Sequence, residues 1–349
     1  MPASPSRANP ANPQKSPKNP LKKTTMLRQF DVNRLVTVFG GSGFVGRHLV
    51  RALCKRGYRI RVAVRRPDLI GHLQPLGRVG QVHGVQANLR HAGSVEAALR
   101  DVDAVVNLVG IMHETGHQRF MEVQANGPER VALAAAKLGI PLVHMSALGA
   151  DANSASRYAK AKAEGERLVL AAKPDAVIMR PSIIFGPEDS FFNRFASMAR
   201  ISPALPLIGG GATRFQPVFA GDVAQAFADA VSGKAKPGTI YELGGPEVRS
   251  FKQLMQSMLG IIERKRLLLP IPFPIAKVQA AFLGLLPNPP LTTDQVELLK
   301  SDTVVSEEAV REHRTLEGLG IKPTLMEAVL PSYLWRYRKA GQFSDRFAL

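Results

Sequence analysis

The hydrophobic pattern between residue 35 and about residue 180 alternates short apolar runs with segments in which apolar residues recur at helical spacing. The short runs are rich in β-branched residues and predict strands at Leu35–Phe39, Arg59–Val64, Val79–Gln86, Ala104–Val109, Leu142–Ser146 and Ala176–Met179. The segments between them predict helices at His48–Lys55, Ser94–Leu99, Gly127–Leu138 and Ser156–Ala171. Because strands that alternate with helices are typical of a parallel sheet covered on both faces, we expect an α/β fold with a doubly wound parallel sheet.

The pattern changes after Arg180. Prolines and glycines become frequent there, and the expected helices Asp222–Val231 and Ser250–Ile262 are separated by irregular stretches. We therefore expect a doubly wound domain over residues 31–180. A smaller, loop-rich substrate or docking region over residues 181–349 is expected to pack on it.

An apolar stretch interrupted by prolines runs from Leu267 to Leu291. Its prolines and Lys277 break the run of about 20 apolar residues that a membrane-spanning helix needs, so we do not expect it to cross a bilayer. Three interpretations stay open: an apolar flap over a pocket, a surface that touches a membrane or a partner, and burial within the fold.

The net charge of +18 favours an acidic partner, such as an anionic membrane surface, an acidic protein or nucleic acid. Nucleic acid is not expected, because aromatic residues make up only 6% of the chain and no nucleic-acid-binding motif is present. The single cysteine, Cys54, excludes an intrachain disulfide and favours a reducing compartment.

Residues 1–30 contain six prolines and six basic residues but no acidic one. Such a segment buries too little apolar surface to offset its ordering entropy, so we expect a disordered basic arm. Its closely spaced prolines also argue against the amphipathic helix of a mitochondrial import signal.

Glycines follow the first expected strand at a spacing that suits a dinucleotide. The turn reads Gly40-Gly41-Ser42-Gly43-Phe44-Val45-Gly46 and leads into a helix. At this spacing one glycine makes the tight turn, one lets the backbone approach a pyrophosphate, and one lets the helix pack on the strand. The helix N-terminus then presents unpaired N–H groups to the phosphates. The turn predicts a Rossmann dinucleotide-binding domain, with residues 40–46 holding the pyrophosphate.

The second expected strand ends at Arg65 and Arg66, about 20 residues beyond the glycines, with no acidic residue before Asp68. At this position an acidic residue binds the ribose 2′-hydroxyl of NAD, whereas arginine accommodates the 2′-phosphate of NADP. Guanidinium groups match phosphate oxygens bidentately. Arg65 and Arg66 therefore predict NADP(H) as the cofactor.

Tyr158 and Lys162 form a Tyr-x-x-x-Lys pair at the start of an expected helix, on one helical face. We expect the ammonium to lower the pKa of the phenol from about 10 and to hold the nicotinamide ribose, so that the phenol can exchange a proton with a carbonyl.

The chain resembles the extended or atypical short-chain dehydrogenase/reductase superfamily from about Arg34 to Tyr337. The similarity includes the glycine turn, the tyrosine and lysine, Asn107–Gly110, Asn126-Gly127, Arg180–Asp189 and Gln216–Ala224. The resemblance implies a catalytic set of Ser146, Tyr158 and Lys162. It also implies that the cofactor contacts Asn88, Leu89, Val109, Gly110, Ser146, Tyr158, Lys162, Pro181, Ser182 and Ile183. Asn88 stands where many relatives place an aspartate, and Ala147 and Leu148 stand where relatives often carry the catalytic hydroxyl.

Within that superfamily the chain is similar to the nucleotide-binding accessory subunits of respiratory complex I, alpha subcomplex subunit nine, in a bacterial form. The similarity lies in Val38–His48, Ser154–Glu166, Phe185–Arg200, Leu269–Pro274 and Leu291–Asp302. The resemblance implies a tightly held structural NADPH beside the quinone-binding junction, with complex I subunits as partners. It implies a peripheral location on the cytoplasmic face of the bacterial inner membrane, or on the matrix side in a mitochondrion. The alternative is an active reductase for a quinone- or lipid-related carbonyl compound, for example in ubiquinone biosynthesis.

His113-Glu114-Thr115-Gly116-His117 matches the His-Glu-x-x-His pattern of zinc proteases. That chemistry needs both histidines on one helix and a third ligand. Because the motif follows a strand and contains Gly116, we expect a loop with no metal, and we expect His113 to line the cofactor or substrate cleft.

Overall fold

A seven-stranded parallel sheet forms the centre of the molecule in the computed structural model, which describes Met1 and residues 34–286 and 289–341. Its strands are β1 (Leu35–Phe39), β2 (Arg59–Val64), β3 (Val82–Gln86), β4 (Ala104–Asn107), β5 (Leu142–Met145), β6 (Val177–Pro181) and β11 (Ile240–Leu243). The order across the sheet is β11-β6-β5-β4-β1-β2-β3, and each neighbouring pair is parallel. The predicted doubly wound α/β fold is thus confirmed.

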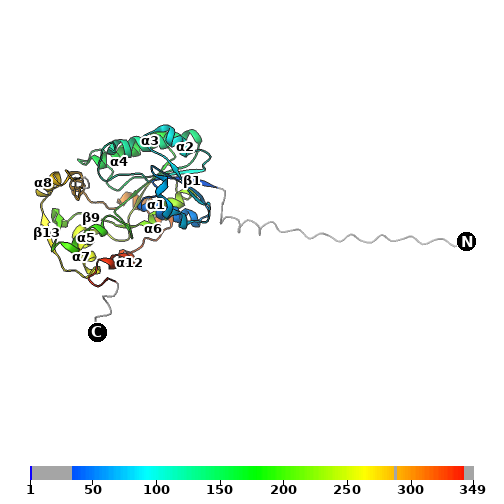
Figure 1. Ribbon diagram of the computed structural model, residues 1–349. Helices are drawn as coiled ribbons and strands as arrows, with labels where there is room; N and C mark the ends of the chain where they lie inside the picture. Colours follow the sequence, from blue (N-terminus) through cyan, green and yellow to red (C-terminus); the bar gives the residue numbers. More distant parts are fainter. Residues whose placement is uncertain (2–33, 287–288, 342–349) are drawn as a thin grey trace.

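Helices cover both faces of this sheet. One face is covered by α1 (Phe44–Lys55) and α6 (Ala220–Val231), whose apolar sides pack with Val36 and Val38 of β1 in one buried cluster. The other face is covered by α2 (Ala92–Ala98), α3 (Gly127–Leu138) and α4 (Arg157–Ala172), which share a second buried cluster with Leu35 and Phe39. Figure 1 shows α2, α3 and α4 side by side along one edge of the molecule. The two clusters follow from the period-2 alternation of a strand that is buried on both faces.

The sheet has a topological switch point between β1 and β4. From β1 the chain moves outward through β2 and β3, then crosses back to β4 on the other side of β1. The connections after β1 and β4 leave in opposite directions and open a crevice at the carboxyl ends of these strands. This is where the glycine turn lies, because it directly follows β1.

Most predicted elements occur where the pattern places them. The strands β1 and β2 and the helix α3 have the predicted bounds, and the other predicted strands differ by a few residues at their ends. The seventh strand, β11, was not predicted. The chain returns to the sheet layers after residue 180, since both α6 and β11 lie beyond the expected domain boundary. A division into two regions therefore stays a proposal.

The C-terminal region is built around an aromatic cluster that includes Phe185, Phe192, Phe215 and Phe251. Its helices are α5 (Phe192–Ile201), α7 (Phe251–Ile261), α8 (Phe273–Leu283), α9 (Thr293–Leu298), α10 (Glu307–Arg311), α11 (Met326–Val329) and α12 (Pro331–Leu334). Its strand pairs are β7 (Ile184–Phe185) with β10 (Val218–Phe219), β9 (Arg214–Phe215) with β12 (Arg249–Ser250), and β8 (Ala204–Ile208) with β13 (Leu267–Ile271). Short 3-10 turns occur at Pro67–Leu69, Gly71–Leu76, Gly209–Gly211, Glu317–Leu319 and Trp335–Tyr337, and a π-helical turn, η4, at Glu122–Asn126.

The apolar stretch that begins at Leu267 forms β13 and α8, which lie at one end of the molecule (Figure 1). Burial within the fold does not describe it, because only Ala276 and Ala280 are nearly inaccessible in α8. Large apolar side chains stand exposed at Leu267, Leu269, Ile275, Val278, Phe282, Leu285 and Leu286. We call these seven side chains the β13–α8 surface.

None of the helices in the described part of the chain is long and apolar enough to span a membrane. The predicted basic arm, residues 1–30, falls almost wholly outside the described residues.

Candidate functional site

The glycine turn at the switch point leaves no room for side chains. Gly40 has a φ of 77°, a left-handed conformation that favours glycine. A Cβ on Gly46 would lie 2.5 Å from the carbonyl oxygens of both Gly40 and Gly41, so α1 could not pack this closely on the turn with any larger residue. Gly43 donates its backbone N–H to Gly40 at 3.0 Å and closes the turn.

The N-terminus of α1 is open to a ligand. Gly43 is the N-cap residue and supplies no side-chain cap, and the first turn contains no acidic residue. Its backbone N–H groups and positive dipole therefore face outward, while Ser42 and Gly43 reach solvent. The side chain of Val109 packs on Gly40, so the predicted residues at the carboxyl ends of β1 and β4 do come together. This arrangement fits a pyrophosphate group.

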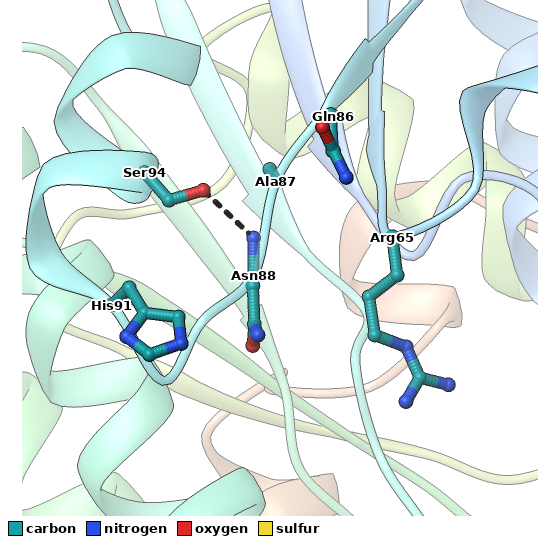
Figure 2. Close-up of a pocket in the computed structure, with 6 residues that line it drawn as sticks. All are labelled: Arg65, Gln86, Ala87, Asn88, His91 and Ser94. Carbon is teal, nitrogen blue, oxygen red and sulfur yellow. Dashed lines mark hydrogen bonds between the residues drawn. The ribbon is translucent and has the colours of Figure 1, made fainter.

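A polar pocket of about 340 Å³ lies at the carboxyl ends of β2 and β3. It is lined by Arg65, Gln86, Ala87, Asn88, His91 and Ser94. Figure 2 shows the Arg65 guanidinium and the Asn88 amide pointing toward the same side of the pocket, with His91 beside Asn88. Ser94 fixes the backbone here, because its Oγ accepts the N–H of Asn88 at 2.9 Å. The six lining residues include one cation and no carboxylate, which suits an anionic group.

The two predicted arginines differ in their surroundings. Arg65 lines the pocket, whereas Arg66 is paired with Asp68 through Nε to Oδ1 at 3.0 Å and Nη2 to Oδ2 at 2.7 Å. Both members of that pair are exposed. Arg66 would have to leave Asp68 to bind a phosphate. His91, which the sequence reasoning missed, lines the pocket with Arg65, at the residue preceding α2.

Lys162 and Ser146 lie together at the end of β5. Lys162 is only 3% exposed, and its Nζ donates to the carbonyl oxygen of Met145 at 3.1 Å. Ser146 is also buried, and its Oγ has no hydrogen-bond partner among the described residues. Burial lowers the pKa of Lys162 to about 8, an effect that the nearby Glu166 opposes. An orphaned hydroxyl beside a desolvated ammonium fits a polar ligand at this point.

Tyr158 precedes Lys162 by one helical turn on α4 and packs edge-on against Phe120, with ring centroids 5.9 Å apart. The expectation that Lys162 lowers the pKa of this phenol is wrong for this structure. Burial, together with the nearby carboxylate of Asp294, raises the pKa of Tyr158 to about 12. The phenol is therefore protonated at neutral pH and can act as a hydrogen-bond or proton donor.

Two buried side chains near Lys162 were missed by the sequence reasoning. Gln124 is on the π-helical turn η4, and neither its Oε1 nor its Nε2 has a partner among the described residues. A Cβ on Gly110 would lie 3.6 Å from both Gln124 Oε1 and Lys162 Nζ, so these groups lie on the same side of Gly110. His144 contacts Asn107 through Nδ1, and burial and Lys162 lower its pKa to about 3, which keeps the imidazole neutral. His144 lies on β5 and Ser146 directly follows it, so their separation of two residues, which places them on the same face, was an available signal.

Other predicted contact residues have structural partners. The Ser182 Oγ donates to the carbonyl of Thr303 at 3.0 Å and so ties the segment after β6 to the C-terminal region. Leu89 is buried, and its carbonyl oxygen accepts from Arg130. Pro181 is also buried, and Ile183 is partly buried. Their roles toward a cofactor stay predictions.

The His-Glu-x-x-His motif lies in a loop, as expected. Thr115 and Gln118 form an isolated bridge within it, and Glu114 pairs with Arg157 at 3.0 Å. In the described part of the chain no cluster of three or more His, Cys, Asp or Glu side chains could hold a metal ion. His113 is partly buried, and it does not line the pocket at Arg65.

The amino-acid sequence of this chain is similar to those of known proteins. Residues 36–244 match the NAD dependent epimerase/dehydratase family. The chain is 36% identical over 320 residues to the mitochondrial NADH dehydrogenase [ubiquinone] 1 alpha subcomplex subunit 9 of Arabidopsis thaliana, covering 88% of this chain and 79% of that protein. It is 34% identical over 178 residues to a ceramide reductase of Caulobacter vibrioides, covering 51% and 55% of the two chains.

A solved double mutant of the dTDP-glucose 4,6-dehydratase of Streptomyces venezuelae, with NAD bound, superimposes with a TM-score of 0.68. That match covers 87% of this chain and 97% of the other, at 21% identity. At this identity the similarity supports the α/β fold and nothing further.

Proposed function

Because this chain belongs to the NAD dependent epimerase/dehydratase family and, within it, to the family of NADH dehydrogenase alpha subcomplex subunit 9, we propose that it is a dinucleotide-binding accessory subunit of respiratory complex I. The observation that carries the proposal is the extent of the similarity, which includes the C-terminal region as well as the nucleotide-binding layers. The dinucleotide then serves chiefly to stabilise the folded subunit by mass action.

The proposed dinucleotide is NADP(H). The glycine turn would hold the pyrophosphate, and Arg65 would bind the 2′-phosphate in the pocket that it shares with Asn88 and His91. A carboxylate at this place would repel that phosphate, and none lines the pocket. Lys162 and Tyr158 would hold the nicotinamide ribose from α4.

The proposed docking site is the β13–α8 surface, against complex I subunits and the adjoining anionic membrane surface. Ile275, Val278 and Phe282 are spaced to lie along one side of α8, each more than half exposed. Lys265 and Arg266 directly precede β13, and the pKa of Arg264 is lowered by burial and by the nearby charges of Arg266 and Arg200. Exposed apolar side chains beside clustered arginines suit an anionic, partly apolar partner. The location would be peripheral, on the cytoplasmic face of a bacterial inner membrane or the matrix side of a mitochondrial one.

Gentle detergent extraction, native electrophoresis and mass spectrometry test this proposal. The wild-type chain should migrate with complex I subunits, and Phe282→Asp should release it. Leu133→Asp is the matched control, because Leu133 is a half-exposed leucine on α3, a helix of the sheet layers. A wild-type chain that migrates alone, or equal release by both variants, would contradict the docking role.

A second candidate is a reductase for an apolar, lipid- or quinone-related carbonyl compound. The protonated Tyr158 and the orphaned Ser146 hydroxyl favour it, since both can donate to a carbonyl oxygen. A bound reduced dinucleotide would supply the hydride. NADPH consumption with a panel of ketones and quinones, abolished by Tyr158→Phe, would support this activity. Tight retention of NADPH without turnover would favour the structural role.

A further inference from the structure

The carboxylate of Asp294 caps the helix that carries Tyr158 and Lys162. Its Oδ1 accepts the backbone N–H of Arg157 at 2.6 Å, and its Oδ2 accepts the hydroxyl of Ser156 at 2.8 Å and the N–H of Tyr158 at 3.2 Å. Ser156 in turn accepts the N–H of Ala159. The first three N–H groups of α4 are thereby satisfied, two of them by a residue more than 130 positions away.

This cap is buried and electrostatically favourable. Ser156 is fully inaccessible and Asp294 is 8% exposed, so water cannot easily replace the carboxylate. The negative charge lies at the positive end of the α4 dipole. Displacement of Asp294 would leave two partly buried N–H groups at the start of α4 without their partner. The start of α4 and the residues around Asp294 are therefore expected to order together.

Asp294 belongs to a helix pair that includes the proposed docking surface. It lies in the first turn of α9, and Glu297 of the same helix pairs with Lys277 of α8 at 3.0 Å. Val296 packs with Ala276 and Ala280 of α8 in a separate buried cluster. Movements of α9 should therefore carry α8 and its exposed apolar side chains with them.

We propose that Asp294 couples the dinucleotide site to the α8–α9 pair, so that a bound dinucleotide orders the docking surface and docking strengthens dinucleotide binding. The inference rests on the proposed dinucleotide site, because Tyr158 and Lys162 are the groups through which binding would order α4. Asp294 is a positioning residue: it acts on the ligand through α4. Coupling of this kind is reciprocal: docking changes the affinity for the dinucleotide by the same factor by which the dinucleotide changes the affinity for the docking partner. A factor of about ten is typical.

Hydrogen–deuterium exchange of the full-length chain, with and without saturating NADPH, tests the coupling. In the wild type, NADPH should slow exchange about tenfold in peptides covering residues 273–300. In Asp294→Asn this protection should disappear, and NADPH should dissociate about tenfold faster. Asp302→Asn is the matched control, since Asp302 lies eight residues after Asp294 but accepts from the backbone and side chain of Arg214 and, within the described part of the chain, has no hydrogen bond or ion pair with α4. It should behave like the wild type.

The outcomes separate this inference from the proposed function. If NADPH binds the wild type but leaves residues 273–300 unprotected, or if Asp294→Asn keeps the full protection, the coupling is refuted while the dinucleotide site stands. If NADPH gives no thermal shift in the wild type, the proposed dinucleotide role fails and the coupling with it. Should Asp294→Asn not fold, Ser156→Ala removes one of the three hydrogen bonds that Asp294 accepts, together with the cap on the N–H of Ala159, and keeps the bonds from Asp294 to the N–H groups of Arg157 and Tyr158. It should reduce the protection in part, and undiminished protection would contradict the proposal.

Discussion

Arg180 of β6 and Glu166 of α4 form a partly buried bidentate ion pair, with Nε to Oε1 at 2.8 Å and Nη2 to Oε2 at 2.5 Å. Glu166 is 4% exposed, and the Arg180 pairing extends to Glu242 on β11 at 3.7 Å. The interaction raises the pKa of the Arg180 guanidinium and joins α4 to the strands beneath it. The helix that carries Tyr158 and Lys162 is thus held at its start by Asp294 and further along by Arg180.

Glu166→Gln should destabilise the fold, by about 3 kcal/mol, because it leaves the partly buried Arg180 charge beside a neutral amide in place of a buried carboxylate. Glu164→Gln on the same helix provides the comparison, since Glu164 makes a similar bidentate pair with Arg167 at the surface. That change should cost less than about 1 kcal/mol. Urea unfolding of the two variants measures the difference, and equal losses would contradict the argument.

Lys162→Met should stabilise the nucleotide-free protein at pH 7. The change removes an ammonium group whose charged form is disfavoured by burial in the folded state. The folded pKa of about 8 lies below the unfolded value of 10.5, so the unfolded state binds more protons between these values. Wild-type stability should therefore rise as the pH increases from about 8 to 10.5, by up to about 3 kcal/mol, and the variant should lack this rise.

The same variant should lose the thermal stabilisation that NADPH gives the wild type. Differential scanning fluorimetry across pH 7 to 10.5, with and without nucleotide, follows both effects. A lower Tm for the nucleotide-free variant at pH 7 would overturn the assignment of Lys162 as a desolvated cation.

Arg65→Ala should weaken NADPH binding about tenfold or more while leaving NADH binding nearly unchanged, because only NADPH has the 2′-phosphate. Arg66→Ala should have a smaller effect, since Arg66 is already engaged with Asp68. Fluorescence titration of the wild type and both variants with each nucleotide gives the six affinities. Tighter binding of NADH than of NADPH to the wild type would refute the NADP assignment.

Gly46→Ala should abolish dinucleotide binding and lower stability, because the added Cβ meets two carbonyl oxygens at 2.5 Å. Gly93→Ala serves as the control: Gly93 is on α2, and no atom lies within 4 Å of a Cβ built there. The free energy of unfolding of this control should rise by roughly 0.5–1 kcal/mol, because alanine has a higher helix propensity than glycine. Thermal melts with NADPH test both, and a Gly46 variant that still binds would contradict the pyrophosphate cradle.

Local patterns predicted the fold and the position of the glycine turn at the end of β1. The runs at Leu35–Phe39 and Arg59–Val64 are strands with the predicted bounds. Leu35–Phe39 is buried at every position, as a strand covered on both faces requires, whereas Arg59–Val64 places its arginines at more exposed positions between buried apolar ones. The glycine turn was equally readable, since the spacing of Gly40, Gly43 and Gly46 is set by local backbone geometry. The missed strand β11 is short, and its polar Glu242 hides it from an apolar pattern.

What the sequence by itself determined about this protein is the doubly wound sheet, the glycine cradle, and the identity of Arg65, Tyr158 and Lys162 as candidate ligand-binding residues. These follow from periodicity and from short spacings within one turn or one strand. Only the tertiary structure decided that Arg66 turns to Asp68, that the Tyr158 pKa rises, and that Asp294 caps α4. Each of these depends on the burial of a group or on its distance to a partner, and for Tyr158 that partner lies 136 residues away, a separation that no local pattern encodes.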